Sequence, residues 1–454
     1  MGEKKHEEGR LKISTVLSYA LATGTGAQFI ATFIGTYASI FLTDIFGVPA
    51  AVAGVIITVG TIWDAMNALI MGSVADHTRS KWGKYRPYLL YVPVPLAIIS
   101  VLFFACPNLS TEGKIVWAAI FYILYGTFAT AIQIPHGAII NAITDKDSQR
   151  HRLVSSYTFV MGIVTTIASS FALVFVAMAG QGDDAKGYRI VMLLAGIVLV
   201  LSNWFCFACT KEKYVSNEVK GEPLRHQLKK LLKVKGLVPV IVVWCMAHLG
   251  FQGMMGSSAY YITYYVGDES LIAPYMLVIS FVGLLGIAVV LPIFSKCFKD
   301  VRTGFVVSQV LTAIANIVLF LVGGKSIAAL FVITAIASVF STMSNAYVPL
   351  LMAEMIDFVY YKTGSQLNAT VGALRGFAAK CASAVTSAVL MFTLSATGYV
   401  ANAKVQTPTV LMGIHSVRFL VPAVSAIIVV IALMRYPVNT KVKSEMENLY
   451  SENK

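Results

Sequence analysis

Long apolar runs separated by short polar segments make up most of this chain, and the runs are continuous rather than alternating. A membrane-spanning helix needs about 20 apolar residues, whereas a barrel strand alternates apolar and polar positions. Twelve runs meet the helical criterion. They cover residues 14–45, 50–75, 87–105, 114–141, 153–178, 188–209, 237–266, 272–294, 304–322, 327–350, 369–397 and 410–434. The pattern predicts an all-α integral membrane protein with twelve transmembrane helices.

The longest polar interruption, TKEKYVSNEVKGEPLRHQLKKLLKVKG, divides six runs from six. Its second half is amphipathic and fits a helix lying on the membrane surface. Two pseudo-symmetric six-helix bundles joined by a long loop resemble the major facilitator superfamily. The expected organisation is an N-terminal tail 1–13, a first bundle 14–209, a linker 210–236, a second bundle 237–434 and a C-terminal tail 435–454.

Charge is scarce and unevenly placed along the chain. Only 13% of the residues are charged, against about 25% in ordinary soluble domains, and the net charge is +13. Most of the Lys and Arg residues lie in alternate inter-run segments, beginning with the N-terminal tail. By the positive-inside rule, both termini and the linker are cytoplasmic. The positive charge therefore indicates membrane topology, not a nucleic-acid partner, and we expect a multi-pass protein of the bacterial inner membrane.

The sequence lacks the motifs of the common enzyme classes. It contains no phosphate-binding loop, no G-x-S-x-G, no HExxH and no Cys/His set with metal-ligand spacing. The six cysteines lie in or beside apolar runs and are interpreted as free thiols. We expect neither an enzyme nor a resident cofactor.

One carboxylate interrupts the second apolar run. Asp64 lies twelve residues before Asp76, where the polar loop begins, a distance of roughly 18 Å along a helix. This depth places Asp64 near the middle of the membrane, where an ionisable group is costly and indicates a functional site. Asn67 shares its helix face. We expect the pair to bind the coupling ion, a proton or Na⁺; the alternative is a structural pair with a basic residue on another helix.

Further polar residues interrupt other runs. Arg375 and Lys380 lie in the eleventh run and should face the protein interior, as substrate contacts or as salt bridges between the halves. In the fourth run, Pro135 removes a backbone hydrogen bond and is expected to open the helix beside Gln133 and His136. An unwound polar patch would suit a substrate, although an internal hydrogen-bonded histidine is an equal alternative for His136.

Gln28 lies among small residues in the first run, and we interpret it as a substrate contact or as a hydrogen bond between helices. A second group of charged residues flanks the predicted cytoplasmic ends of both bundles. We expect these residues to form ion pairs that close the cytoplasmic side, with a solvated loop face as the alternative. The group consists of Asp76, Arg79, Lys84 and Arg86 after the second run, and Glu354 and Asp357 after the tenth.

The segment WDAMNALIMGSVADHTRSKWGKYRPYLL, residues 63–90, resembles the signature of the glycoside–pentoside–hexuronide:cation symporters, the family of the melibiose and glucuronide carriers. That signature reads W-D-A-x-N-D-P-x-M-G and then D-x-T-x-x-R-W-G-K-[FY]-R-P. YASIFLTDIFGV, AEMIDFVYYKTG and YVANAKVQTPTVLMGI also match the family. The resemblance covers roughly residues 14–437 and implies alternating-access transport of a sugar together with H⁺ or Na⁺.

Several positions depart from the melibiose-carrier pattern. Gln28, Ala68 and Gln133 stand where that pattern has acids, and Thr158 stands where it has an Arg. Arg375 replaces an uncharged residue, whereas Asp64, Asn67 and Lys380 are kept. The resemblance thus implies a substrate site containing Gln28, Gln133, His136, Thr158, Asn345, Arg375 and Lys380.

One carboxylate against two cations predicts an anionic, hexuronide-like substrate. A neutral glycoside or pentoside is the alternative, and loss of the second motif acid leaves H⁺, Na⁺ and uncoupled transport open. A lipid transporter and a transporter-like membrane sensor are less favoured, because the runs contain polar residues and the tails are short. We expect a monomer that binds only the bilayer and a small sugar or sugar acid.

Overall fold

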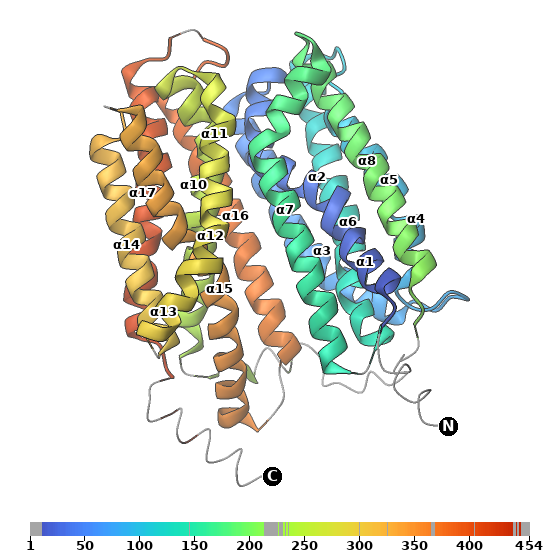
Figure 1. The fold of residues 1–454 in the computed structure, drawn as a ribbon. Helices are drawn as coiled ribbons and strands as arrows, with labels where there is room; N and C mark the ends of the chain where they lie inside the picture. The colour runs from blue at the N-terminus through green and yellow to red at the C-terminus, as the bar shows by residue number, and fades with distance from the viewer. Residues whose placement is uncertain are drawn as a thin grey trace, which may run out of the picture. The chain divides into compact units, whose positions relative to one another are not determined.

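The computed structural model describes most of the chain, and every regular element within the described residues is a helix. The described residues are 11–144, 146–212, 226, 230–231, 233–234, 236–298, 300–324, 326–364, 368–403, 405–438, 442 and 445. Two compact units emerge, residues 1–219 and 220–454 (Figure 1). The exact domain boundaries stay a prediction, and seven of the thirteen residues of the amphipathic linker segment, 224–236, lie outside the described residues.

The N-terminal unit is a bundle of long helices, some of them interrupted. Two π-helical turns interrupt the first span, at Thr23–Ala27 and Phe41–Ile45. The α-helices are α1 (Ile13–Ala22), α2 (Gln28–Ile40), α3 (Ala50–His77), α4 (Arg86–Tyr91), α5 (Pro93–Phe103), α6 (Thr111–Ile143), α7 (Asp147–Gly180) and α8 (Asp184–Cys209).

The C-terminal unit is a second bundle. π-Helical turns lie at Tyr261–Val266, Val278–Val282 and Gly286–Val290, and one 3₁₀ turn lies at Glu269–Leu271. The α-helices are α10 (Leu237–Tyr260), α11 (Ile272–Leu277), α12 (Gly283–Leu285), α13 (Leu291–Cys297), α14 (Val301–Val322), α15 (Ile327–Thr363), α16 (Asn368–Thr397) and α17 (Pro408–Met434).

Eleven helical stretches of the described chain are long and apolar enough to cross a membrane. The all-helical membrane architecture is therefore confirmed, whereas the count of twelve is not. The predicted run 87–105 is the exception, because the regular helix is divided at Val92 into α4 and α5, although Val92 itself keeps helical backbone angles. Pro93 has no backbone N–H to donate and its fixed φ suits a new first turn, which explains the break.

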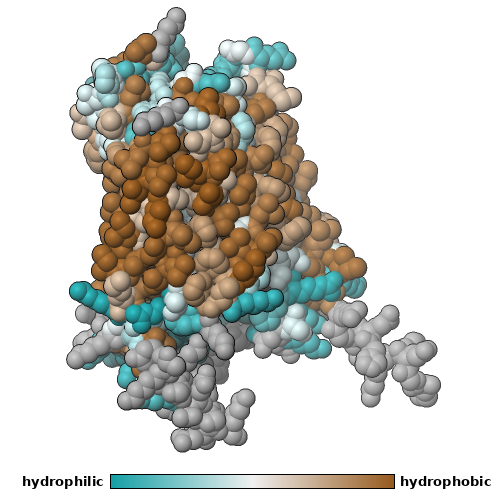
Figure 2. Space-filling view, turned by 60° about the vertical axis from the view of Figure 1, so that its left-hand side comes forward, coloured by the Kyte–Doolittle hydropathy of each residue, from teal (hydrophilic) through white to brown (hydrophobic). Residues whose placement is uncertain are grey.

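The outer surfaces of the helices carry many exposed large apolar side chains, which lipid would cover in a membrane. Examples are Val55, Ile62, Leu194, Ile314 and Leu321. Figure 2 shows hydrophobic residues covering the middle of the visible face, with hydrophilic residues gathered toward its two ends. Such a belt is the surface expected of a protein that spans a bilayer.

The interior of the N-terminal bundle is aromatic. Phe33, Phe41, Phe104 and Tyr188 are buried and pack ring against ring, with centroid separations of 4.5–5.5 Å. Three of these pairs are edge-to-face, one is tilted and one is stacked, and such ring contacts add to the stabilisation from burial. These ring contacts hold α2 against α5 and α8.

Candidate functional site

Asp64 and Asn67 on α3 both contact α6. The Asp64 carboxylate accepts a hydrogen bond from the hydroxyl of Thr130. Gly126 lies beside Asp64, where a Cβ would make an ordinary van der Waals contact, 3.4 Å from the Cβ of Asp64. Asn67 is buried and donates from Nδ2 to the carbonyl of Thr127, at 3.2 Å. The α3–α6 pair therefore brings one carboxylate, one hydroxyl and one amide together inside the first bundle.

This group can hold a small cation or a proton. Carboxylate, hydroxyl and amide oxygens are ligands that hard cations prefer, and a single carboxylate can also be protonated. Among the described residues, no group of three or more His, Cys, Asp or Glu side chains could hold a metal ion. Sequence reasoning missed Thr130; its polarity within an apolar run, one turn before Gln133, was the available signal.

Gln28 connects two helices of its own bundle. Its Nε2 donates to the hydroxyl of Thr165 on α7, at 2.9 Å, and to that of Thr32 one turn further along α2, at 3.1 Å. Both of its amide protons are thereby used. This geometry supports the interpretation of Gln28 as a hydrogen bond between helices more than as a substrate contact.

His136 is 3% exposed, and both ring nitrogens have partners. Nε2 lies 3.0 Å from the carbonyl of Tyr19, which can only accept, so Nε2 carries the proton. Nδ1 then accepts from the hydroxyl of Thr23, at 2.9 Å. The imidazole also stacks on the Tyr19 ring, with 4.3 Å between centroids. The geometry favours an internal, hydrogen-bonded histidine over a substrate ligand.

The expected opening of the helix at Pro135 is wrong. α6 runs unbroken from Thr111 to Ile143 with Pro135 inside it. A transmembrane helix tolerates proline when neighbouring groups satisfy the freed carbonyl. Gln133 is exposed on this helix, whereas His136 is buried. Thr158 on α7 is exposed as well. No unwound patch joins these side chains.

A small polar cavity lies in the C-terminal bundle, between α10, α15 and α16. Its volume is about 40 Å³. It is lined by Trp244, Ala247, His248, Ser344, Asn345, Val348, Arg375 and Ala379. Two predicted substrate residues, Asn345 and Arg375, are thus brought together. Trp244 and His248 were missed. An aromatic residue in an apolar run gives no signal of a polar cavity, whereas the polarity of His248 within its run was an available signal.

Arg375 is half-buried and faces this cavity. Its Nη1 lies 3.9 Å from the sulfur of Met352, which is a weak acceptor. Across the cavity, His248 Nε2 lies 3.1 Å from the hydroxyl of Ser383. Lys380, further along α16, is half-buried and does not line the cavity. Of the two cations predicted in this helix, Arg375 is the one placed at a polar void.

The loop between α3 and α4 folds around Glu212, a residue that the sequence assigned to the linker. Its carboxylate accepts the backbone N–H groups of Lys84, Tyr85 and Arg86, at 2.7, 2.7 and 2.8 Å. Gly83 has φ of +112°, and a Cβ there would lie 2.6 Å from the carboxyl carbon of Glu212. A glycine is therefore required for the clamp.

Arg86, predicted to be a gating residue, is held within its own bundle. Nη2 donates to the carbonyl of Phe207 at 2.7 Å and Nη1 to that of Trp82 at 3.3 Å. The guanidinium also lies 4.4 Å above the Phe207 ring. These contacts fasten the loop to the end of α8 and favour a structural role for Arg86. Arg79 is exposed, and the side chain of Asp76 lies outside the described residues.

The predicted acidic loop after residue 350 is a helix instead. α15 continues to Thr363 and ends at Gly364, whose φ of +63° suits a helix end. Glu354 accepts a hydrogen bond from the hydroxyl of Tyr436, at 3.1 Å. Burial, and then the neighbouring Glu354, raise the pKa of Tyr436, so the phenol remains a donor. Asp357 is exposed on the same helix.

Arg418 is a buried cation that sequence reasoning did not assign. It is fully buried in α17, and its Nη2 donates to the hydroxyl of Tyr275, at 2.7 Å. The guanidinium also lies 4.9 Å from the Phe419 ring centroid and 5.4 Å from that of Tyr275. The phenol lies 3.2 Å from the hydroxyl of Thr334 on α15. This chain of contacts connects three spans of the second bundle.

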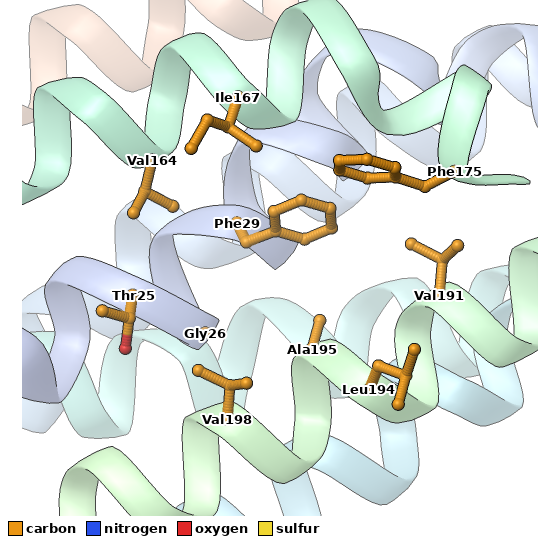
Figure 3. A pocket seen from close by; sticks show the side chains of 10 residues that line it. All are labelled: Thr25, Gly26, Phe29, Val164, Ile167, Phe175, Val191, Leu194, Ala195 and Val198. Carbon is orange, nitrogen blue, oxygen red and sulfur yellow. The ribbon is translucent and has the colours of Figure 1, made fainter.

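A larger groove on the first bundle is apolar. It has a volume of about 330 Å³ and is drawn in Figure 3, where Phe29 from α2 and Phe175 from α7 face side chains of α8. The hydroxyl of its polar residue, Thr25, already donates to the carbonyl of Leu21 at 2.6 Å. A sugar would find no free donor and only one hydroxyl acceptor among these side chains, so this groove is not a candidate for the sugar site.

Comparisons with known proteins give a consistent result. Residues 19–440 match the family model described as MFS/sugar transport protein. The chain is 30% identical over 419 residues to an isoprimeverose transporter of Lactiplantibacillus pentosus, covering 91% of this chain and 86% of the relative. It is 28% identical over 454 residues to a glucuronide carrier protein homolog of Escherichia coli, covering 95% and 94%. The crystal structure of a D-xylose–proton symporter has a similar fold, with a TM-score of 0.63, 16% identity and coverage of 92% and 96%.

Proposed function

This chain belongs to the MFS/sugar transport protein family, and from that membership we propose that it imports a hexuronide-like sugar acid together with a cation. Transport proceeds by alternating access between the two bundles of a bacterial inner-membrane protein whose termini are cytoplasmic. It is a membrane transporter and not an enzyme. We assign a negative charge to the substrate, and we assign residues to the substrate and to the coupling ion.

The placement of Arg375 supports the anionic substrate most directly. A guanidinium in a membrane-spanning helix is costly unless it is paired or solvated. This one faces a polar cavity with no carboxylate among its described lining residues, and its Nη1 contacts the thioether of Met352. A carboxylate of the substrate would supply the missing charge and accept two parallel hydrogen bonds.

The remaining polar residues support the same assignment. Gln28, Ala68 and Gln133 carry no charge where melibiose-type relatives are expected to have acids. The first bundle therefore offers few groups that would repel an anion, and the second supplies Arg375 at the polar cavity, with Lys380 further along the same helix. Asn345, exposed at the same cavity, is assigned to the hydroxyl groups of the sugar.

Asp64, with Asn67 and Thr130, is assigned to the coupling ion. With one carboxylate the group is neutral when it holds either H⁺ or Na⁺, and the hydrogen bond from Thr130 fixes the orientation of the carboxylate. At the cytoplasmic side we keep Asp76, Arg79, Lys84, Glu354 and Asp357 as gating candidates. The contacts of Arg86 favour a structural role instead.

A competition experiment tests the proposed substrate. Uptake of a labelled glucuronide into membrane vesicles is measured against unlabelled glucuronides and the matching neutral glucosides. The glucuronides should compete at least about 10-fold better, since a charge-assisted pair contributes about 1.5–3 kcal/mol. Arg375→Gln should narrow that difference. Equal competition in the unaltered protein would overturn the proposal.

A neutral glycoside is the second candidate. Isoprimeverose, the sugar in the name of the relative that is 30% identical, carries no carboxylate. If this chain takes such a substrate, Arg375 would bind a ring hydroxyl or stay solvated. The same competition experiment decides between the two, because a neutral substrate predicts that glucosides compete as well as glucuronides.

A further inference from the structure

The indole N–H of Trp244 is a buried donor without a partner. Trp244 lies on α10, is 2% exposed, and its Nε1 has no hydrogen-bond partner among the described residues. Leaving a buried donor unsatisfied costs about 1–3 kcal/mol. Native proteins rarely keep such a group unless a ligand or an ordered water pairs with it. Trp244 lines the same cavity as Arg375.

The cavity has a surplus of donors. The guanidinium of Arg375 and the amide of Asn345 both belong to its lining. The Ser344 hydroxyl accepts from Nε2 of Gln309, at 2.8 Å, which leaves its own proton to donate. Within the described part of the chain, no acidic side chain contributes to the lining. A group rich in acceptor lone pairs and carrying negative charge satisfies these donors best.

The size of the cavity limits what can enter it. About 10–15 Å³ is enough for one water molecule, and this cavity measures about 40 Å³. A carboxylate group fits that space, but a pyranose ring does not. The cavity therefore suits one functional group of a larger substrate, whose ring must stay outside it.

We infer that Trp244 and Arg375 form a carboxylate subsite within the C-terminal bundle. The indole N–H donates to one oxygen of the substrate's carboxylate, in addition to the two parallel hydrogen bonds that the guanidinium donates. Trp244 is thus a specificity-determining residue that selects an acid over the matching alcohol. This inference rests on the proposed function, because it names the residue that shares the binding of the acid group with Arg375.

The test uses Trp244→Phe, which keeps an aromatic ring and removes the N–H. Trp204→Phe is the matched control, because the Nε1 of Trp204 donates to the carbonyl of Leu90, at 2.9 Å, in the other bundle. Inhibition of labelled-glucuronide uptake is measured for glucuronic acid glycosides and for neutral glucosides. In Trp244→Phe the acids should bind about 10-fold more weakly, with the glucosides within about 2-fold, while the control keeps the preference of the unaltered protein.

A second pair of variants covers the case in which Trp244→Phe fails to fold. Ala379→Asp places a carboxylate in the subsite itself, whereas Ala379→Asn adds similar bulk without charge. Ala379→Asp should abolish the preference for acids, and Ala379→Asn should retain most of it. The same loss in both variants would overturn the subsite.

The outcomes separate the two claims. If the unaltered protein prefers acids and Trp244→Phe retains that preference, the subsite is wrong and the proposed function stands. If Trp244→Phe weakens acids and glucosides equally, the indole acts through packing and the subsite is also wrong. If the unaltered protein shows no preference for acids, the proposed function fails and the subsite fails with it.

Discussion

Removing the Glu212 carboxylate should release the loop between α3 and α4. The carboxylate accepts three consecutive backbone N–H groups, from Lys84, Tyr85 and Arg86, at 2.7–2.8 Å. These residues lead directly into α4, where the amides of a first helical turn have no partner within the helix. Glu212→Ala leaves all three amides to water, and Glu212→Gln keeps one neutral acceptor in place.

The size of the effect follows from the kind of hydrogen bond. A bond to a charged group contributes about 1.5–3 kcal/mol, and loss of a helix N-cap costs about 0.5–2 kcal/mol. Glu212 is half-buried, so water recovers part of the loss after substitution. We therefore expect local opening to become easier by about 1–3 kcal/mol, or about 5- to 150-fold, since 1.4 kcal/mol is tenfold.

Hydrogen–deuterium exchange of the purified transporter measures this directly. Peptides covering residues 84–86 should exchange about 5- to 150-fold faster in Glu212→Ala, with an intermediate rate in Glu212→Gln. Peptides from α14 in the other bundle serve as the internal reference. Unchanged protection of the three amides in Glu212→Ala would refute the clamp.

Three further predictions concern the first bundle's packing, the coupling group and the buried cation. Gly26→Ala should lower the melting temperature by several degrees, because a Cβ there would lie 2.2 Å from the backbone nitrogen of Leu199. Gly35→Ala is the control and should leave the melting temperature unchanged, because a Cβ at Gly35 would have nothing within 4 Å. Equal melting temperatures for the two variants would contradict this prediction. Asp64→Asn should reduce gradient-driven uptake at least about 10-fold while counterflow exchange continues, and full accumulation would exclude Asp64 from coupling. Tyr275→Phe removes the hydroxyl that accepts a hydrogen bond from Arg418, and it should destabilise the protein by about 1–3 kcal/mol in thermal denaturation. Unchanged stability would contradict this prediction.

The sequence predicted the membrane architecture because its signal is local. Continuous apolar runs of sufficient length correspond to spans in the structure, and an apolar stretch of helix length has few other stable conformations in lipid. Where the structure differs from the prediction or leaves it unconfirmed, the cause is also local. The run 87–105 contained Pro93, which ended one helix and began another. α15 passes Glu354 and Asp357 without interruption, because charges near the end of a long helix are hydrated and do not break it.

The polar site was only partly predictable, because polarity alone does not reveal which partner a side chain finds. His136 and Gln28 are polar residues within apolar runs, as a ligand residue would be. Their hydrogen-bonding groups are nevertheless taken up by partners on other helices. Glu212 was read as a linker charge, although it binds a loop more than 120 residues away in sequence. Trp244 gave no signal, since an aromatic residue is expected in an apolar span.

The charge of the substrate is the central claim, and calorimetric titration of the purified transporter with two ligands tests it most directly. One ligand is a methyl glucuronide; the other is its methyl ester, which keeps the ring and hydroxyl groups but has no charge. The account predicts that the acid binds at least about 10-fold more tightly than the ester, and that Arg375→Gln removes most of this difference. Equal affinity for the two ligands, or tighter binding of the ester, would contradict it.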